Sequence, residues 1–383
     1  MKVALVHDWS SSYAGSERVL EQLLLLFPSA NLYMVADFIP PAERTFLGGR
    51  RPQTTFIQRL PLASRWVRNY LPLMPLAVES LDLSGYDVVI SSSHAVAKGV
   101  LTGAGQLHLC YCHTPLRYAW DLQHQYLRDA GLTSGWRGAA ALALLHYMRM
   151  WDLRTAHGVD QFLANSSHVA ARIRRTYRRT ATVVYPPVDT EYFAPGGRRE
   201  EYYFTASRIV PYKRVELLLE AFRSLPGRRL VVAGDGPGLA RCRRIAPSNV
   251  ELLGSVGRSR LRSLMQGARA FLYAAEEDFG IVLAETQACG TPVICYGRGG
   301  AVDIVEEGET GLMFNAQTAE AAGDAVWRFQ RMGKCWDPAR IRRRAQRFDT
   351  RVFRQKFMDE FSSLVDPGIP DPEQLRPREV AGK

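Results

Sequence analysis

The sequence predicts an α/β fold with two Rossmann-like domains, each a doubly wound parallel sheet, that face each other across a cleft. Two observations support this prediction. Short apolar runs rich in β-branched residues alternate with helical patterns in both halves of the chain, which is typical of parallel sheets covered by helices. The chain has 383 residues, of which 46% are hydrophobic, so it is longer than one core usually covers and has enough apolar residues for two.

The strand candidates fall into two groups separated by a proline- and glycine-rich stretch at 185–200. The first group comprises residues 3–6, 88–91, 107–112, 161–165 and 182–185, and the second comprises 202–206, 229–233, 250–253, 270–273, 292–295 and 311–314. We therefore predict one domain over 1–188 and a second over 189–348. A helix over 349–366 is expected to pack back toward the first domain, and the polar tail 367–383 is expected to be disordered.

Composition and charge limit the cellular location and the binding partners that can be expected of the chain. The formal net charge of +11 favours a polyanionic partner such as phosphates, nucleic acid or an anionic membrane face. The opening apolar run, Val3 to Val6, is too short for a secretion signal, and the stretch 138–150 falls short of the roughly 20 residues of a membrane span. Six cysteines spread unevenly along the chain do not resemble a disulfide framework. The expected location is the cytoplasm.

Two basic features have alternative interpretations. Residues 50–81 mix arginines with aromatic residues and prolines, which fits either an interfacial or acceptor-binding surface or an irregular helical insertion that covers the sheet. The arginine clusters at 172–179 and 341–344 could bind nucleic acid in isolation, although a solvated helix face or contact with anionic lipid is the preferred interpretation.

The strongest signal of function is the segment EDFGIVLAE at 277–285, which follows a predicted strand and opens a predicted helix. Backbone N–H groups of Phe279, Gly280 and Ile281 would lie at the positive end of this helix, where a diphosphate or sugar hydroxyls can bind. Glu277 precedes the helix and Glu285 lies inside it, so both carboxylates can face one ligand. The alternative is a helix stabilised by an acidic residue near its start.

A second signal is the segment SRIVPYKR at 207–214, directly after the strand predicted at 202–206. Arg208 and Lys213 can both reach one diphosphate from the end of this strand and neutralise the charge that grows on a leaving nucleotide. A solvated basic helix start is the alternative, and Arg214 fits it.

In the first half, the segment AGSER at 14–18 follows the first predicted strand, and Gly15 would let backbone N–H groups approach a phosphate. His113 ends a predicted strand just before Pro115, so its imidazole should point into the cleft. With His113, Cys110 and Cys112 could suggest a metal site. Alternate positions on a buried strand are the simpler interpretation, because no second cluster supplies the remaining ligands, and no metal is predicted.

The Arg-x4-Lys segment, the GDGP turn at 234–237 and the Glu-x7-Glu segment, in this order and spacing, resemble glycosyltransferase family 4, whose members are retaining enzymes with the GT-B fold. The segment YCHTPLRYAWD at 111–121 is similar to a segment of bacterial mannosyltransferases of O-antigen and exopolysaccharide assembly. The resemblance covers about residues 1–360. The chain departs from the family at Ala14-Gly15, where two adjacent glycines are usual.

The resemblance implies roles for these residues. Arg208 and Lys213 would bind the donor diphosphate, Glu285 the ribose and Glu277 the donor sugar, with backbone contacts from residues 279–281. His113 would contact the transferring sugar and belong, with Glu277, Arg208 and Lys213, to the catalytic group.

Three further implications concern the first domain, which would bind the acceptor. Gly15 would approach a donor phosphate, and Arg117 and Asp121 would contact the acceptor. For His113 a general base and a structural histidine are the alternatives.

The resemblance therefore implies a glycosyltransferase that moves a hexose, with mannose from GDP-mannose as the first expectation, onto a bacterial, lipid-linked glycan. No cofactor or metal is expected, because Arg208, Lys213 and helix dipoles can take the electrostatic role of a metal ion. Peripheral contact with the inner face of the plasma membrane is expected, and nucleic-acid binding is not. The alternatives are the same chemistry with GDP-fucose or a UDP-hexose, an epimerase of the same fold, and a non-catalytic scaffold that binds nucleic acid or membrane.

Overall fold

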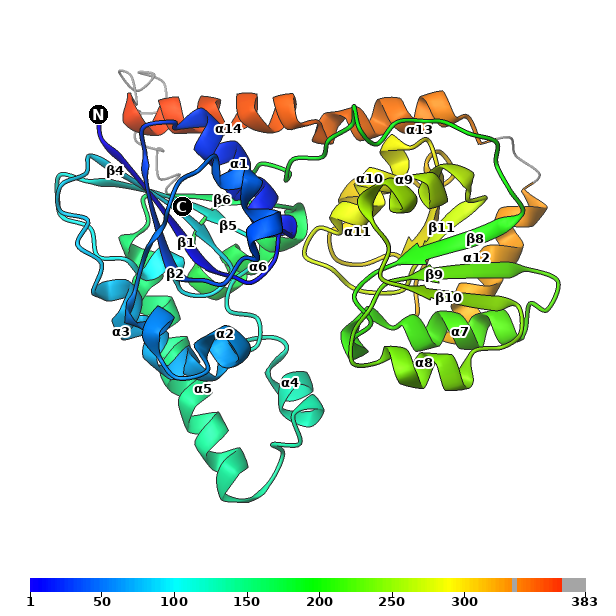
Figure 1. Cartoon of the computed structure of the whole chain (residues 1–383), viewed down its shortest axis with the longest axis horizontal. Coiled ribbons are helices and arrows are strands. Elements are labelled where there is room, and N and C mark those ends of the chain that lie inside the picture. Colours follow the sequence, from blue (N-terminus) through cyan, green and yellow to red (C-terminus); the bar gives the residue numbers. More distant parts are fainter. Residues whose placement is uncertain (333–335, 367–383) are drawn as a thin grey trace, which may run out of the picture.

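The computed structural model describes residues 1–332 and 336–366. In this part of the chain two parallel sheets lie in separate units (Figure 1), which confirms the predicted α/β fold with two Rossmann-like domains. The strand order is β3-β2-β1-β4-β5-β6-β7 in the first sheet and β10-β9-β8-β11-β12-β13 in the second. The tail 367–383 lies outside the described residues, and with it the expectation that it is disordered.

The strands of both sheets are short and mostly buried, as expected for sheets covered on both faces. The first sheet contains β1 (Val3–Ser10), β2 (Asn31–Asp37), β3 (Gln53–Thr54), β4 (Val88–Ser93), β5 (Leu107–Cys112), β6 (Gln161–Ala164) and β7 (Thr182–Val183). The second contains β8 (Tyr202–Ala206), β9 (Arg229–Ala233), β10 (Val250–Gly254), β11 (Ala270–Tyr273), β12 (Val293–Tyr296) and β13 (Gly311–Phe314).

Helices cover both sheets (Figure 1). In the first unit they are α1 (Gly15–Leu26), α2 (Ala63–Trp66), α3 (Met74–Glu79), α4 (Gln123–Asp129), α5 (Gly135–Thr155) and α6 (Ser167–Tyr177). The second unit has α7 (Val215–Arg223), α8 (Leu239–Ile245), α9 (Arg258–Gly267), α10 (Ile281–Ala288), α11 (Ala301–Ile304), α12 (Ala319–Arg331) and α13 (Pro338–Ala345). The last helix is α14 (Thr350–Val365).

Residues 50–81 form short helical turns rather than one long helix. They comprise β3, α2, α3 and the 3₁₀ turns η2 (Phe56–Arg59) and η3 (Val67–Leu73). Ile57, Val67 and Met74 are buried against the first sheet, whereas Leu62 and Trp66 are exposed. The interpretation as an irregular helical insertion that covers the sheet is therefore confirmed, and the interpretation as an interfacial or acceptor-binding surface stays a prediction.

The chain order reverses once in each sheet, between β1 and β4 and between β8 and β11. In doubly wound sheets, ligands bind outside the carboxyl ends of the strands at such a switch point. The segment 207–214 follows β8, and the segment 277–285 comes after β11. Both segments selected from the sequence therefore leave the second sheet at its switch point.

The last helix joins the two units. Figure 1 shows α13 and α14 along one side of both units, with α14 against the first. Phe353, Phe357 and Phe361 of α14 are buried in the same apolar cluster as Val3 and Leu5 of β1. The core of the first unit thus includes residues from near both ends of the described chain.

Candidate active site

The loops after β8 and β11 bring Lys213 and Glu277 together. Their side chains form an ion pair and are 14% and 15% exposed. The hydroxyl of Tyr273 lies 3.1 Å from Lys213 Nζ and donates a hydrogen bond to Glu277 Oε1 at 2.9 Å. Burial and the neighbouring Glu277 carboxylate raise the pKa of Tyr273 far above its usual value, so the phenol stays protonated. The cation and the carboxylate are thereby fixed in one hydrogen-bonded group.

The start of α10 lies directly after Glu277. Gly280 caps the helix with a φ of 88°, a conformation that L side chains rarely adopt. The ring of Phe279 is buried against Tyr185 and Phe348, with centroids 5.8 and 5.4 Å apart. Phe279 can therefore offer a ligand only backbone groups. Since the first N–H groups of a helix lack intrahelical partners, this end of α10 can bind an anion.

Two glycine-containing turns shape the loops of the site. An added Cβ at Gly234, where φ is 137°, would lie 1.9 Å from the carbonyl oxygen of Ser207. An added Cβ at Gly300 would lie 2.4 Å from Cα of Phe279. The backbone of Ser207, next to Arg208, and that of Phe279, close to Glu277, therefore approach these glycines too closely for any side chain to fit between them. This close approach accounts for the glycines at 234–237 and 297–300 without a phosphate-binding role.

Arg208 lies in the same loop as Lys213 but is exposed. Within the described ranges its guanidinium has no ion-pair partner. The structure therefore joins Lys213, and not Arg208, to Glu277.

Glu285 forms an ion pair with Arg18 of α1, across the boundary between the units. The Glu285 side chain is almost fully buried, and Arg18 is 23% exposed. Burial opposes the charge on Arg18, but the Glu285 carboxylate outweighs it and raises the Arg18 pKa. The segment AGSER was selected for Gly15 alone, and the sequence reasoning missed Arg18, whose partner is 267 positions away.

Gly15 is the first residue of α1, and a Cβ added there would meet nothing within 4 Å in the described structure. Its φ is not in the left-handed region. The fold itself does not demand glycine at this position, because neither sterics nor conformation requires it. Open space next to a helix start is compatible with the close approach of a phosphate.

His113 follows β5 and is held from two sides. Its Nε2 lies 2.8 Å from Ser92 Oγ, and its carbonyl oxygen accepts a hydrogen bond from Asn165 Nδ2 at 2.9 Å. Burial, followed by the nearby His7 and His94, lowers the pKa of His113 to about 3. The imidazole is therefore neutral at neutral pH and able to exchange hydrogen bonds with hydroxyl groups.

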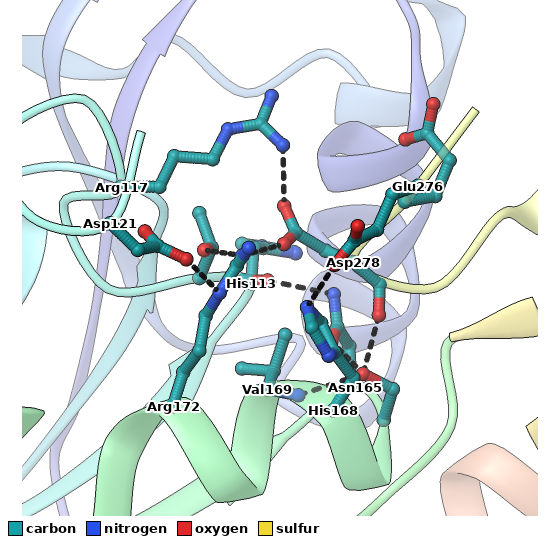
Figure 2. Close-up of polar contacts among 12 residues, drawn as sticks. His113, Arg117, Asp121, Asn165, His168, Val169, Arg172, Glu276 and Asp278 are labelled. Carbon is teal, nitrogen blue, oxygen red and sulfur yellow. Dashed lines mark hydrogen bonds and ion pairs between the residues drawn. The ribbon is translucent and has the colours of Figure 1, made fainter. Parts of the chain in front are cut away.

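Arg117 and Asp121 belong to a cluster between the two units, shown in Figure 2. Arg117 Nη1 lies 3.0 Å from Asp278 Oδ2, and Arg172 Nη1 binds the other oxygen of the same carboxylate. Asp121 Oδ2 lies 2.8 Å from Arg172 Nε. The sequence reasoning missed Asp278, which stands next to Glu277 in the motif, and assigned Arg172 to a solvated cluster. In the structure Arg172 is 14% exposed and paired.

Cys110 and Cys112 occupy alternate positions of β5 in one apolar cluster with Phe162, Val169 and Ile173. Burial raises the Cys112 pKa well above its usual value. Within residues 1–332 and 336–366, no group of three or more His, Cys, Asp or Glu side chains is arranged to hold a metal ion. Nor is any described helix both long and apolar enough to span a membrane.

Each of the two units matches a different model of a known protein family. Residues 14–192 match the model "Glycosyltransferase Family 4", and residues 190–347 match "Glycosyl transferases group 1". A curated relative, D-inositol 3-phosphate glycosyltransferase of Mycobacterium avium, is 34% identical over 166 residues, which cover 38% of this chain and 39% of the relative. The chain thus matches about two fifths of that relative's length.

Solved structures match almost the whole chain at low identity. Sucrose-phosphate synthase from Thermosynechococcus elongatus has a TM-score of 0.72 at 17% identity, covering 96% of this chain and 100% of the other. Anabaena HepE in complex with UDP has a TM-score of 0.68 at 18% identity, covering 95% and 100%. These likenesses show the fold. Together with the two matched models, they identify the chain as a pair of glycosyltransferase domains arranged in the GT-B fold.

Proposed function

We propose that the chain transfers a hexose from a nucleotide-sugar donor to a glycan acceptor with retention of configuration, and that mannose from GDP-mannose is the first candidate. The observation that carries this proposal is the convergence of Lys213, Glu277 and the start of α10 at the switch point of the second sheet. A cation and a helix start suit a diphosphate, and a carboxylate beside them suits sugar hydroxyls.

In the proposed reaction Lys213, Arg208 and the N–H groups of residues 279–281 bind the donor diphosphate and stabilise the charge that develops on it. Glu277 and the neutral imidazole of His113 bind the sugar. Glu285 releases its ion-pair partner Arg18 and accepts hydrogen bonds from the ribose hydroxyls instead. Gly15 leaves space for a phosphate.

The acceptor oxygen attacks the anomeric carbon from the face that the nucleotide leaves, as the bond to the phosphate oxygen breaks. Its proton passes to a donor phosphate oxygen. Neither Glu277 nor Glu285 forms a covalent adduct, and the electrostatic role of a metal falls to Lys213, Arg208 and α10.

A UDP-hexose is the second candidate donor. It is favoured by the solved structures of Anabaena HepE in complex with UDP and with UDP-glucose. GDP-fucose is a third.

A thermal-shift screen separates the donors. We expect one nucleotide sugar, tested among GDP-mannose, GDP-fucose and UDP-hexoses, to raise the melting temperature selectively, with the same shift in EDTA because the diphosphate binds to cations of the protein. Stabilisation by about 2.7 kcal/mol is expected at a ligand concentration 100 times the Kd. A chain that none of these donors stabilises, and that hydrolyses none of them, would be a non-catalytic scaffold. A shift abolished by EDTA would overturn metal independence.

We further propose a lipid-linked acceptor at an anionic membrane face, with Arg117 and Asp121 beside the acceptor. The support is an exposed apolar surface on α5, which projects from the first unit (Figure 1). Trp136 is 81% exposed and Met150 61%. Exposed arginines also occur on α2, η3 and α5 of the same unit, namely Arg65, Arg68 and Arg137. Apolar side chains with adjacent arginines fit an anionic lipid surface.

Vesicle sedimentation tests the membrane contact. The wild-type chain is expected to bind phosphatidylglycerol vesicles and not phosphatidylcholine vesicles, and Trp136→Ser should weaken this binding. Trp327→Ser is the matched control, because Trp327 is a 49% exposed tryptophan on α12 of the other unit. Equal binding by both variants, or no binding by the wild type, contradicts the proposal.

A further inference from the structure

Three consecutive acids, Glu276, Glu277 and Asp278, stand in the loop after β11, and Glu277 and Asp278 each have their own cationic partner. Glu277 pairs with Lys213 of the second unit. Arg117 and Arg172 of the first unit bind Asp278. His168 Nε2 of the same unit lies 3.9 Å from Glu276, but burial lowers the pKa of this imidazole, so it adds no fixed charge. Adjacent carboxylates repel one another, so the apposition of the two units removes a repulsion that the second unit alone leaves in place.

Of the two contacts with the first unit, that of Asp278 is the more enclosed. Its side chain is 17% exposed, and those of Arg117 and Arg172 are 19% and 14% exposed. Figure 2 shows Arg117 and Arg172 reaching the carboxylate from two directions. The backbone of Asp278 is held as well, because Ser166 Oγ donates a hydrogen bond to its carbonyl oxygen. Ser166 caps α6, so both the side chain and the main chain of Asp278 are held by the first unit.

The opposite side of the same loop is fixed by the second unit. Gly300 N donates to the carbonyl oxygen of Glu277 at 2.8 Å, and Gly299 pairs with Glu277 in an isolated β-bridge. Ser167 of α6 contacts α11, the helix that follows these glycines, since its backbone N–H donates to Asp303 at 2.7 Å. Residues 277–279 therefore lie between glycines of one unit and the arginines of the other.

Arg117 also contacts the loop that carries Lys213. Its guanidinium lies 5.4 Å from the ring centroid of Tyr212, and Lys213 Nζ lies 5.1 Å from the same centroid. One arginine of the first unit thus contacts both loops that bring together Lys213 and Glu277.

We propose that Asp278 is a positioning residue: its pairing with Arg117 and Arg172 closes the two units and sets the loop on which Glu277 meets the donor sugar. Asp278 does not touch the reacting atoms and acts through Glu277. This inference rests on the proposed function for the role of Glu277, whereas the closure itself is independent of any donor.

Asp278→Asn tests the proposal, because it keeps the shape of the side chain and removes its charge. With fluorophores on the two units, energy transfer in the protein without ligand should fall, and turnover at saturating donor should fall about tenfold. The Kd for GDP and UDP should change less than about twofold, since Lys213 remains. Asp278→Glu should restore part of the turnover. A purely structural role would lower the melting temperature without this split between turnover and nucleotide affinity.

Further variants distinguish closure of the two units from a local effect of Asp278→Asn. Arg117→Gln breaks the same pair from the other unit without altering the loop, and the double variant with Asp278→Asn should add little to either single change. The matched control is Glu251→Gln, which breaks an exposed ion pair with Arg229 inside the second unit. Unchanged energy transfer in both Asp278→Asn and Arg117→Gln overturns the closure, and reduced transfer with wild-type turnover overturns the positioning role. If the wild type turns over no donor, the proposed function fails while the energy-transfer result still decides closure.

Discussion

Glu277→Gln is expected to lower turnover at saturating donor by about 100- to 1,000-fold, the range found when one group that stabilises a transition state is removed. Glutamine keeps the size of the side chain and can still accept a hydrogen bond from Tyr273, which lies 2.9 Å from Glu277 Oε1. It loses the charge that orients Lys213 and binds sugar hydroxyls. The Kd for the nucleotide diphosphate, measured by calorimetry, should change less than about threefold because the cations that bind it remain.

Glu276→Gln is the control for this experiment. Glu276 is the same residue type one position away, 41% exposed, and 3.9 Å from His168. It should keep near wild-type turnover. An equal loss in both variants would show that charge in this loop, rather than contact of Glu277 with the donor, determines the rate. Wild-type turnover in Glu277→Gln would remove Glu277 from the catalytic group.

Lys213→Met is expected to weaken both nucleotide binding and turnover, each by about 10- to 100-fold. The ammonium group supplies charge-assisted hydrogen bonds to the diphosphate before and during transfer, so its loss affects both steps. Methionine keeps most of the aliphatic stem and removes the ammonium group, whose Nζ lies 5.1 and 5.8 Å from the ring centroids of Tyr212 and Tyr273. Calorimetry with GDP and UDP, together with a donor-turnover assay, measures the two effects separately.

Arg223→Gln provides the matched removal of a cation. Arg223 is exposed on α7 of the same unit and pairs with Glu220 at 3.1 Å. If the two variants lose nucleotide affinity equally, the effect of Lys213 is one of net charge and not of contact. A fall in turnover with unchanged Kd for Lys213→Met would restrict its role to the transition state.

Most of the fold follows from local sequence patterns, and the exceptions have physical reasons. The second sheet was predicted strand by strand because turn residues separate its apolar runs. β2 and β3 were missed. Residues 32–36 of β2 are buried on both faces, so they show no alternation, and they closely follow the apolar end of α1. β3 has only two residues, and its pairing with Tyr33 and Met34 alone makes it a strand.

The residues of the candidate site also fall into two groups, those that sequence motifs indicate and those that only the structure places. Lys213, Glu277, Gly280 and Glu285 could be selected because their motifs follow strands and open a helix. Arg18 and Arg172 could not be placed, because their partners are 267 and 106 positions away and depend on how the two units meet. Asp278 gave one usable signal: it is the third of three consecutive acids, whose mutual repulsion is reduced where the fold places cations beside them.

The position of α14 has a consequence for biosynthesis. The ribosome synthesises all seven strands of the first sheet, and then the second unit, before it makes Phe353, Phe357 and Phe361. Until then, the face of the first sheet that these rings cover is exposed to water. Multidomain chains generally fold from the N-terminus as they emerge, domain by domain. Here the part of the protein that is translated first is the part that is completed last.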